Sequence, residues 1–122
     1  MACRRQVRPD GKILNTARLL FVVQRYSAML LGPLVIIHLL VIMYAVRNGL
    51  TADEILGRTQ GSFIWSGFYL LFVLAVSVHA PIGVRNVLNE WTGLSAKSVN
   101  MVCAVLALLM LLTGLRAVLA VT

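Results

Sequence analysis

Three apolar runs, each long enough to cross a lipid bilayer, constrain this chain more than any other feature. They cover residues 26–46, 63–88 and 99–121. About 20 mainly apolar residues cross the hydrocarbon core as a helix. Of the 122 residues, 60% are hydrophobic and 12% are charged, whereas soluble domains are about half apolar and about a quarter charged. The sequence therefore predicts an all-α membrane protein with three transmembrane helices.

The net charge of +7 is concentrated before the first apolar run. We expect residues 1–25 to form a basic cytoplasmic segment and residues 26–122 to form the three-helix transmembrane domain. A basic segment beside a membrane span is typical of orientation signals and of contact with anionic lipid, which argues against nucleic-acid binding. The run 26–46 is too long for the apolar part of a cleaved signal peptide. The basic residues of the segment are Arg4, Arg5, Arg8, Lys12, Arg18 and Arg25.

The two connections between the apolar runs are polar. Thr51, with Glu54 three residues later, predicts a capping box on a short interfacial helix. Trp91, in the second connection, is expected at the level of the lipid headgroups. The positive-inside rule predicts a cytoplasmic N-terminus and second connection, with the first connection and the C-terminus outside. No organelle-targeting presequence is evident, so we expect the inner membrane of a prokaryote.

Several functional classes are disfavoured by what the chain lacks. No carboxylate pair, nucleophile–base set or phosphate loop is evident, which argues against a stand-alone enzyme. The acidic residues lie in connections rather than spans, which argues against a proton-relay transporter subunit. Cys3 and Cys103 provide no disulfide framework and have no ligand-like spacing. We expect Cys3 to face the reducing cytoplasm and Cys103 to pack as a small apolar residue.

Two histidines, His38 and His79, lie deep inside the first two runs. Ionisable groups inside a membrane favour a function, and neutral imidazole is a common metal ligand. At about 1.5 Å per residue, His38 lies about 20 Å and His79 about 14 Å from the cytoplasmic edge. The two rings either occupy different layers or meet one haem from opposite sides. Alternatively, each histidine only hydrogen-bonds a serine or carbonyl of a neighbouring helix.

The neighbours of His79 suit a flat macrocycle. Gly83 lies one turn away on the same face and allows close approach to the backbone. Pro81 removes a backbone donor and can kink the helix. Arg85 lies toward the interface, where it can neutralise a haem propionate. On the first span, Gly32 and Pro33 precede His38 by one to two turns. They could likewise allow close approach to the backbone and kink the helix.

The order of these residues resembles a known family. Three segments resemble the second span of the membrane anchor subunits of succinate dehydrogenases and fumarate reductases. They are Gln60-Gly61-Ser62-Phe63, His79-Ala80-Pro81-Ile82-Gly83-Val84-Arg85 and Asn89-Glu90-Trp91. The family's haem-ligating histidine corresponds to His79. Arg25-Tyr26-Ser27 resembles the Arg-x-Ser of the family's first span, and His38 lies where two-haem anchors carry a ligand. The resemblance covers about residues 24–122.

This resemblance implies an electron-transfer role. Electrons pass from a flavoprotein subunit through an iron–sulfur subunit to quinone, with haem b alongside. The implied metal ligands are His79 and His38, and the implied haem-binding residues are His79, Gly83, Arg85 and His38. The implied quinone-binding residues are Arg25, Ser27 and Trp91. Arg25 can instead anchor lipid phosphate, and Ser27 can be a helix-start or packing residue.

The chain departs from the family at three positions. Gln24 replaces the histidine that single-haem anchors often carry before the arginine. Phe21 replaces a serine that helps to hold quinone in some members. Glu90-Trp91 replaces an acidic–tyrosine pair, so a quinone donor has to come from a partner chain or from the Trp91 N–H.

Three helices cannot easily enclose a haem, so we expect this chain to be half of a larger bundle. A different anchor subunit or a second copy of the chain would complete it. One bridging haem or two haem layers would result, depending on whether only His79 or both histidines are used. A haem-free anchor of another soluble complex is the main rival. The sequence leaves open the quinone type, the direction of electron flow and the source organism.

Overall fold

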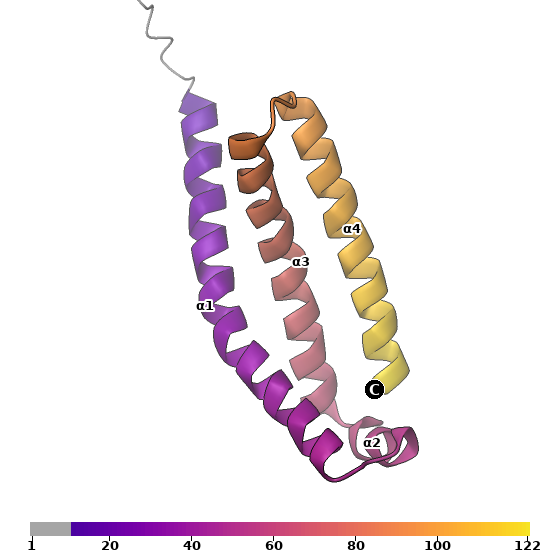
Figure 1. The fold of residues 1–122 in the computed structure, drawn as a ribbon. Coiled ribbons are helices and arrows are strands. Elements are labelled where there is room, and N and C mark those ends of the chain that lie inside the picture. The colour runs from indigo at the N-terminus through magenta and orange to yellow at the C-terminus, as the bar shows by residue number, and fades with distance from the viewer. Residues whose placement is uncertain (1–10) are drawn as a thin grey trace, which may run out of the picture.

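Three long helices and one short helix make up the computed structural model, which describes residues 11–122. Figure 1 shows α3 between α1 and α4, with α2 at the end where α1 finishes. The three long helices are each long and apolar enough to cross a membrane. The predicted all-α membrane fold is confirmed. The helices are α1 (Gly11–Arg47), α2 (Ala52–Thr59), α3 (Phe63–Trp91) and α4 (Ala96–Val121).

Helix α1 is much longer than the first apolar run. Its 37 residues extend about 55 Å at about 1.5 Å per residue, whereas the hydrocarbon core is about 30 Å thick. Residues 11–25, part of the expected basic segment, continue the same helix. Hydropathy indicates where lipid contact begins, not where a helix begins. Residues 1–10, including Cys3, Arg4, Arg5 and Arg8, lie outside the described residues.

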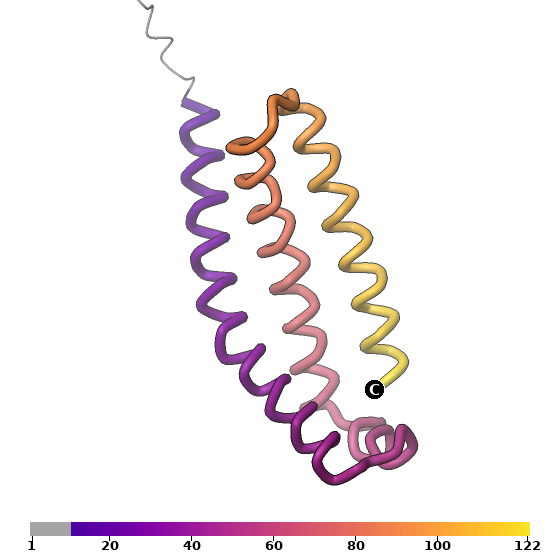
Figure 2. The backbone as a smooth tube through the Cα atoms, viewed as in Figure 1, coloured from indigo at the N-terminus to yellow at the C-terminus, as the bar shows by residue number. Residues whose placement is uncertain are grey.

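A bend divides α1 near its middle, as Figure 2 shows. Pro33 lies inside the helix and cannot donate the backbone hydrogen bond of that turn. Proline is the usual cause of such bends. The bend redirects the C-terminal half of α1 relative to the half that precedes it.

The side of α1 that packs on α3 is a narrow stripe. Ser27, Leu31 and Leu34 are buried, and Gln24 and His38 extend this stripe at alternating spacings of three and four residues. This spacing keeps the residues on one face of a helix. Most other large apolar side chains of α1 are exposed. The structure therefore leaves apolar surface for lipid or for another membrane subunit.

Helices α3 and α4 approach each other closely at Gly114. A Cβ atom added at Gly114 would lie 2.6 Å from Cγ1 of Val73, so only glycine fits without movement. Small residues allow this close backbone approach between membrane helices. Cys103, on the same helix, is buried, as the sequence predicted.

The predicted capping box at α2 is confirmed. The backbone N–H of Thr51 donates to Oε2 of Glu54 at 2.7 Å, and the backbone N–H of Glu54 donates to Oγ1 of Thr51 at 3.4 Å. The backbone hydrogen bond from Thr51 contributes most to lowering the pKa of Glu54. A guanidinium N–H of Arg58 donates to the hydroxyl of Tyr44 at 3.4 Å, which links α2 to the end of α1.

Candidate functional site

Helices α1 and α3 are joined by a hydrogen bond at His79. Oγ of Ser27 lies 3.1 Å from Nδ1 of His79, and Ser27 is buried. The hydroxyl of Ser27 also donates to the backbone carbonyl of Gln24 at 3.0 Å. The three groups form a short chain of hydrogen bonds from the imidazole to the backbone of α1.

The two contacts of Ser27, taken together, favour one tautomer of this histidine. A hydroxyl has one proton, and the carbonyl of Gln24 can only accept one. When both contacts form at once, the hydroxyl of Ser27 donates to Gln24 and accepts from the Nδ1–H of His79. In a neutral imidazole with the proton on Nδ1, the lone pair lies on Nε2. No group in residues 11–122 forms a hydrogen bond to Nε2.

This arrangement fits a metal ligand. Histidines that bind metals nearly always donate their other ring N–H to an oxygen, which fixes the tautomer and the ring orientation. Residues 11–122 contain no group of three or more His, Cys, Asp or Glu that could hold a metal ion. Haem iron does not need such a group, because the protein supplies only axial ligands. His79 is therefore suited to hold haem through Nε2.

Gln24 is a neighbour of this site whose contact the sequence did not predict. A Cβ atom added at Gly83 would lie 3.3 Å from Nε2 of Gln24, so the amide of α1 rests against Gly83 one turn from His79. Oε1 of Gln24 is buried without a hydrogen-bond partner in the described chain. The three-residue spacing from Gln24 to Ser27 was the available signal, because it places both residues on one helix face.

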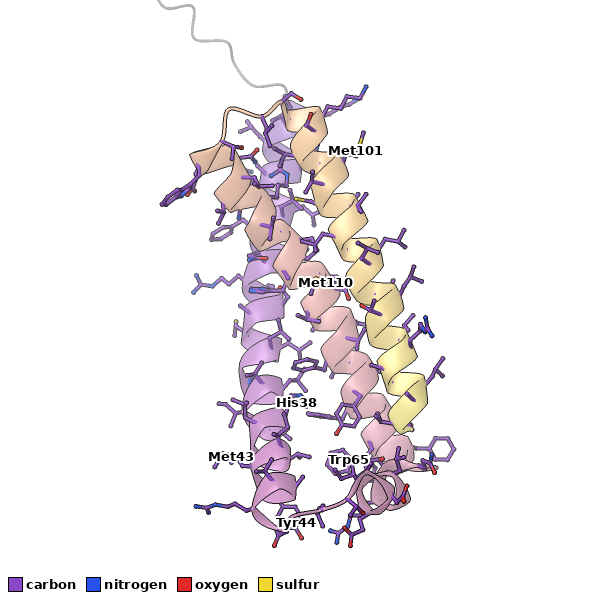
Figure 3. The ribbon with its side chains drawn as sticks, turned by 45° about the vertical axis from the view of Figure 1, so that its right-hand side comes forward. His38, Met43, Tyr44, Trp65, Met101 and Met110 are labelled. Atoms are coloured by element: carbon purple, nitrogen blue, oxygen red, sulfur yellow. The ribbon has the colours of Figure 1, made fainter. Side chains whose placement is uncertain are left out.

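His38 lies in a different environment. Its ring centroid is 5.2 Å from that of Phe72 and 6.1 Å from that of Tyr69, both on α3. In Figure 3, His38 and Trp65 lie on the facing sides of α1 and α3. A cavity of about 320 Å³ adjoins His38. Nδ1 of His38 is buried and has no hydrogen-bond partner among residues 11–122.

The two histidines are not brought together. Ser27, the partner of His79, precedes His38 by 11 residues on α1, or about 16 Å at about 1.5 Å per residue. The structure therefore places the two rings in separate layers, not on opposite faces of one iron atom. The alternative expectation is that each histidine forms a hydrogen bond to a serine or carbonyl of a neighbouring helix. His79 has such a contact with Ser27, whereas His38 has none in the part of the chain described.

Arg85 faces away from the histidine. Its Nε donates to Oδ1 of Asn100 on α4 at 3.1 Å. Arg85 follows His79 by six residues, which turns it about 120° around the helix at 3.6 residues per turn. In this structure the Nε of Arg85 is held by α4, and the expected contact of Arg85 with a haem propionate stays a prediction.

The three candidate quinone-binding residues are also separated. Ser27 is buried and bonded to His79, whereas Arg25 is exposed. Trp91 is 84% exposed and ends α3, 12 residues and about 18 Å beyond His79 at about 1.5 Å per residue. The structure therefore joins Ser27 to His79 and leaves Arg25 and Trp91 exposed, and the quinone role of these residues stays a prediction.

Comparison of the whole sequence with models of known protein families identifies the family of the chain. The family model described as succinate dehydrogenase/fumarate reductase transmembrane subunit matches residues 1–117. The chain belongs to this family. No curated protein and no solved structure matches it. Together with the three spanning helices, membership makes the chain a multi-pass membrane protein that associates with the catalytic subunits of such complexes.

Proposed function

We propose that this chain is a haem b-binding membrane anchor of a succinate:quinone oxidoreductase, with His79 as an axial ligand of the iron. The observation that carries the proposal is the hydrogen bond from Nδ1 of His79 to Ser27, which leaves the Nε2 lone pair for iron. Family membership supports the redox setting.

Each residue of the site has a distinct task. His79 would hold the iron through Nε2, and haem, when bound, supplies reversible one-electron transfer. Ser27 keeps the proton on Nδ1 and fixes the plane of the ring. The carbonyl of Gln24 keeps the hydroxyl of Ser27 in its accepting orientation.

A second membrane unit would complete the site. The described residues place no second histidine in the layer of His79, so a second protein ligand for a haem there would be supplied by another membrane unit. The exposed apolar side chains of α1, such as Met29 (66%) and Ile36 (60%), provide surface for such a unit. A different anchor subunit or a second copy of this chain meets the requirement.

The cytoplasmic end would serve the catalytic subunits. We place the N-terminus in the cytoplasm of a prokaryote, where an iron–sulfur subunit and a flavoprotein subunit dock. Electrons then pass to or from quinone near this surface. Arg25 is exposed on α1 and would be accessible to a quinone carbonyl or to lipid phosphate, while exposed Trp91 suits the headgroup level.

His38 is the second candidate ligand. It lies in its own layer beside a cavity, which supports a site separate from that of His79. No partner fixes its tautomer in the described chain, so a ligand or another subunit would have to satisfy Nδ1.

The test is the reduced-minus-oxidised visible spectrum of the purified complex. We expect His79→Ala to remove the b-type signal of its layer while the catalytic subunits stay attached. His79→Met, which offers a sulfur ligand, should retain haem at a raised potential. A full b-type signal in His79→Ala would show that the histidine only joins α1 to α3.

A haem-free anchor is the alternative supported by the same contact. A histidine bonded to a serine across two membrane helices also stabilises helix packing without any metal. In that case the wild-type complex would show no b-type signal, and His79→Ala would affect only stability.

A further inference from the structure

Figure 1 shows one end of the bundle at which α1 begins, α3 ends and α4 begins. Two hollows adjoin near this end. They have volumes of about 260 and 270 Å³, and both are lined by Thr16 and Arg85. We refer to the two together as the basic groove. It is separate from the layer of His79, because neither His79 nor Ser27 lines either hollow.

The lining of the basic groove is layered. Each of the three helices contributes a polar residue at the rim and an apolar residue about one turn deeper. Ile82 and Cys103 lie within the apolar runs of α3 and α4, so the deeper layer lies at membrane depth. The pairs are Thr16 with Leu20, Arg85 with Pro81, and Asn100 with Cys103.

The rim of the groove is positively charged. Arg85 is partly buried, and only its Nε is hydrogen-bonded, to Asn100. The other guanidinium nitrogens of Arg85 have no hydrogen-bond partner within residues 11–122. Lys12 lines the second hollow, and no Asp or Glu of the described residues lines either one. A partly buried cation without a carboxylate favours an anionic ligand.

We propose that the basic groove binds the phosphate of an anionic membrane phospholipid. Arg85 and Lys12 contact the phosphate, and an acyl chain lies against Leu20 and Ile82. The shape decides between a lipid and inorganic phosphate, because only a lipid has an apolar chain for the deeper layer. The direction also fits, since the polar rim lies toward the headgroups and the apolar layer toward the bilayer centre.

Native mass spectrometry of the purified complex tests this proposal. The probe is phosphatidylglycerol, compared with phosphatidylcholine and with excess inorganic phosphate. We expect one retained phosphatidylglycerol for each copy of the chain. Arg85→Gln and Lys12→Gln should each weaken retention about fivefold, since one cation near a charged lipid contributes about 1 kcal/mol. Arg85→Lys keeps the charge and should retain the lipid.

Arg18→Gln is the matched control, because Arg18 is exposed on α1 near the same end and lines neither hollow. It should retain the lipid as the wild type does. Equal retention of phosphatidylcholine, displacement by inorganic phosphate, or unchanged retention in Arg85→Gln would overturn the proposal. The outcome is independent of haem, because His79→Ala should lose the b-type signal and keep the lipid.

Discussion

His79 and His38 both lie deep inside apolar runs of the sequence, yet their surroundings between α1 and α3 differ. At His79, the hydroxyl of Ser27 on α1 lies 3.1 Å from Nδ1, and the tautomer that donates a hydrogen bond to it has its lone pair on Nε2. At His38, Nδ1 is buried without a partner, and aromatic rings and a cavity lie beside it. The difference teaches that two histidines at membrane depth can have different hydrogen-bond environments, so depth alone does not distinguish them as candidate ligands.

The largest expected effect is on haem content, and it tests whether the layers of His79 and His38 are independent. We predict that His38→Ala leaves the haem of the His79 layer in place, because His38 lies about 16 Å along α1 from Ser27, the partner of His79, at about 1.5 Å per residue. In a two-haem complex the haem content falls by half, and in a one-haem complex it is unchanged. Haem-to-protein stoichiometry measures this. Loss of all haem in His38→Ala would show that the layers are not independent.

A packing change near His38 should have the next largest effect. Gly114→Ala would force Val73 to move, because the added Cβ would lie 2.6 Å from its Cγ1. Overpacking of this kind costs about 1–3 kcal/mol. Thermal unfolding of the complex in detergent measures the loss. Gly67→Ala is the control, since its Cβ would meet no atom within 4 Å. Equal stability of the two variants would contradict the observed α3–α4 contact.

Ser27→Ala should tune the His79 layer without emptying it. A typical hydrogen bond contributes about 1 kcal/mol, which corresponds to about 40 mV for a one-electron couple. The loss of the acceptor lowers the basicity of the imidazole, so the midpoint potential should rise. Redox titration of the b-type signal measures this shift. Ser27→Thr keeps the hydroxyl and should restore the wild-type potential. An unchanged potential in Ser27→Ala would show that the serine does not act on the ligand.

The smallest effect concerns the cap of α2, near the His38 layer. The pKa of Glu54 is lowered in the folded chain, chiefly by the hydrogen bond from the backbone of Thr51. The carboxylate therefore stabilises α2 above its ordinary pKa of 4.5, and this contribution is lost as pH falls through the lowered value. Amide exchange in α2, compared with α4 at each pH, should accelerate on acidification. Glu54→Gln removes the titrating carboxyl and should abolish this pH dependence, and a persisting dependence would count against the cap.

Much of the fold could be predicted from the sequence. Apolar runs indicate membrane helices because lipid requires them, and Thr51 with Glu54 predicts a local cap because the interaction spans only three residues. The start of α1 at Gly11 could not be predicted, since residues 11–25 are helical without being uniformly apolar. Hydropathy carries no information about a helix that extends beyond the lipid.

The site was less predictable because it depends on how the helices align. The sequence indicates His79, but its pairing with Ser27 is set by the register between α1 and α3. The same applies to Arg85, whose direction depends on Asn100 of α4. Close contacts such as Gly114 against Val73 fix this alignment, and no local motif encodes them.

An electron cryo-microscopy map of the assembled complex tests the role of His79 most directly. We predict porphyrin density beside α3 at this level, with Nε2 of His79 toward the iron and Nδ1 toward Ser27. An imidazole packed only against protein side chains, with no porphyrin next to it, would contradict the proposed ligation.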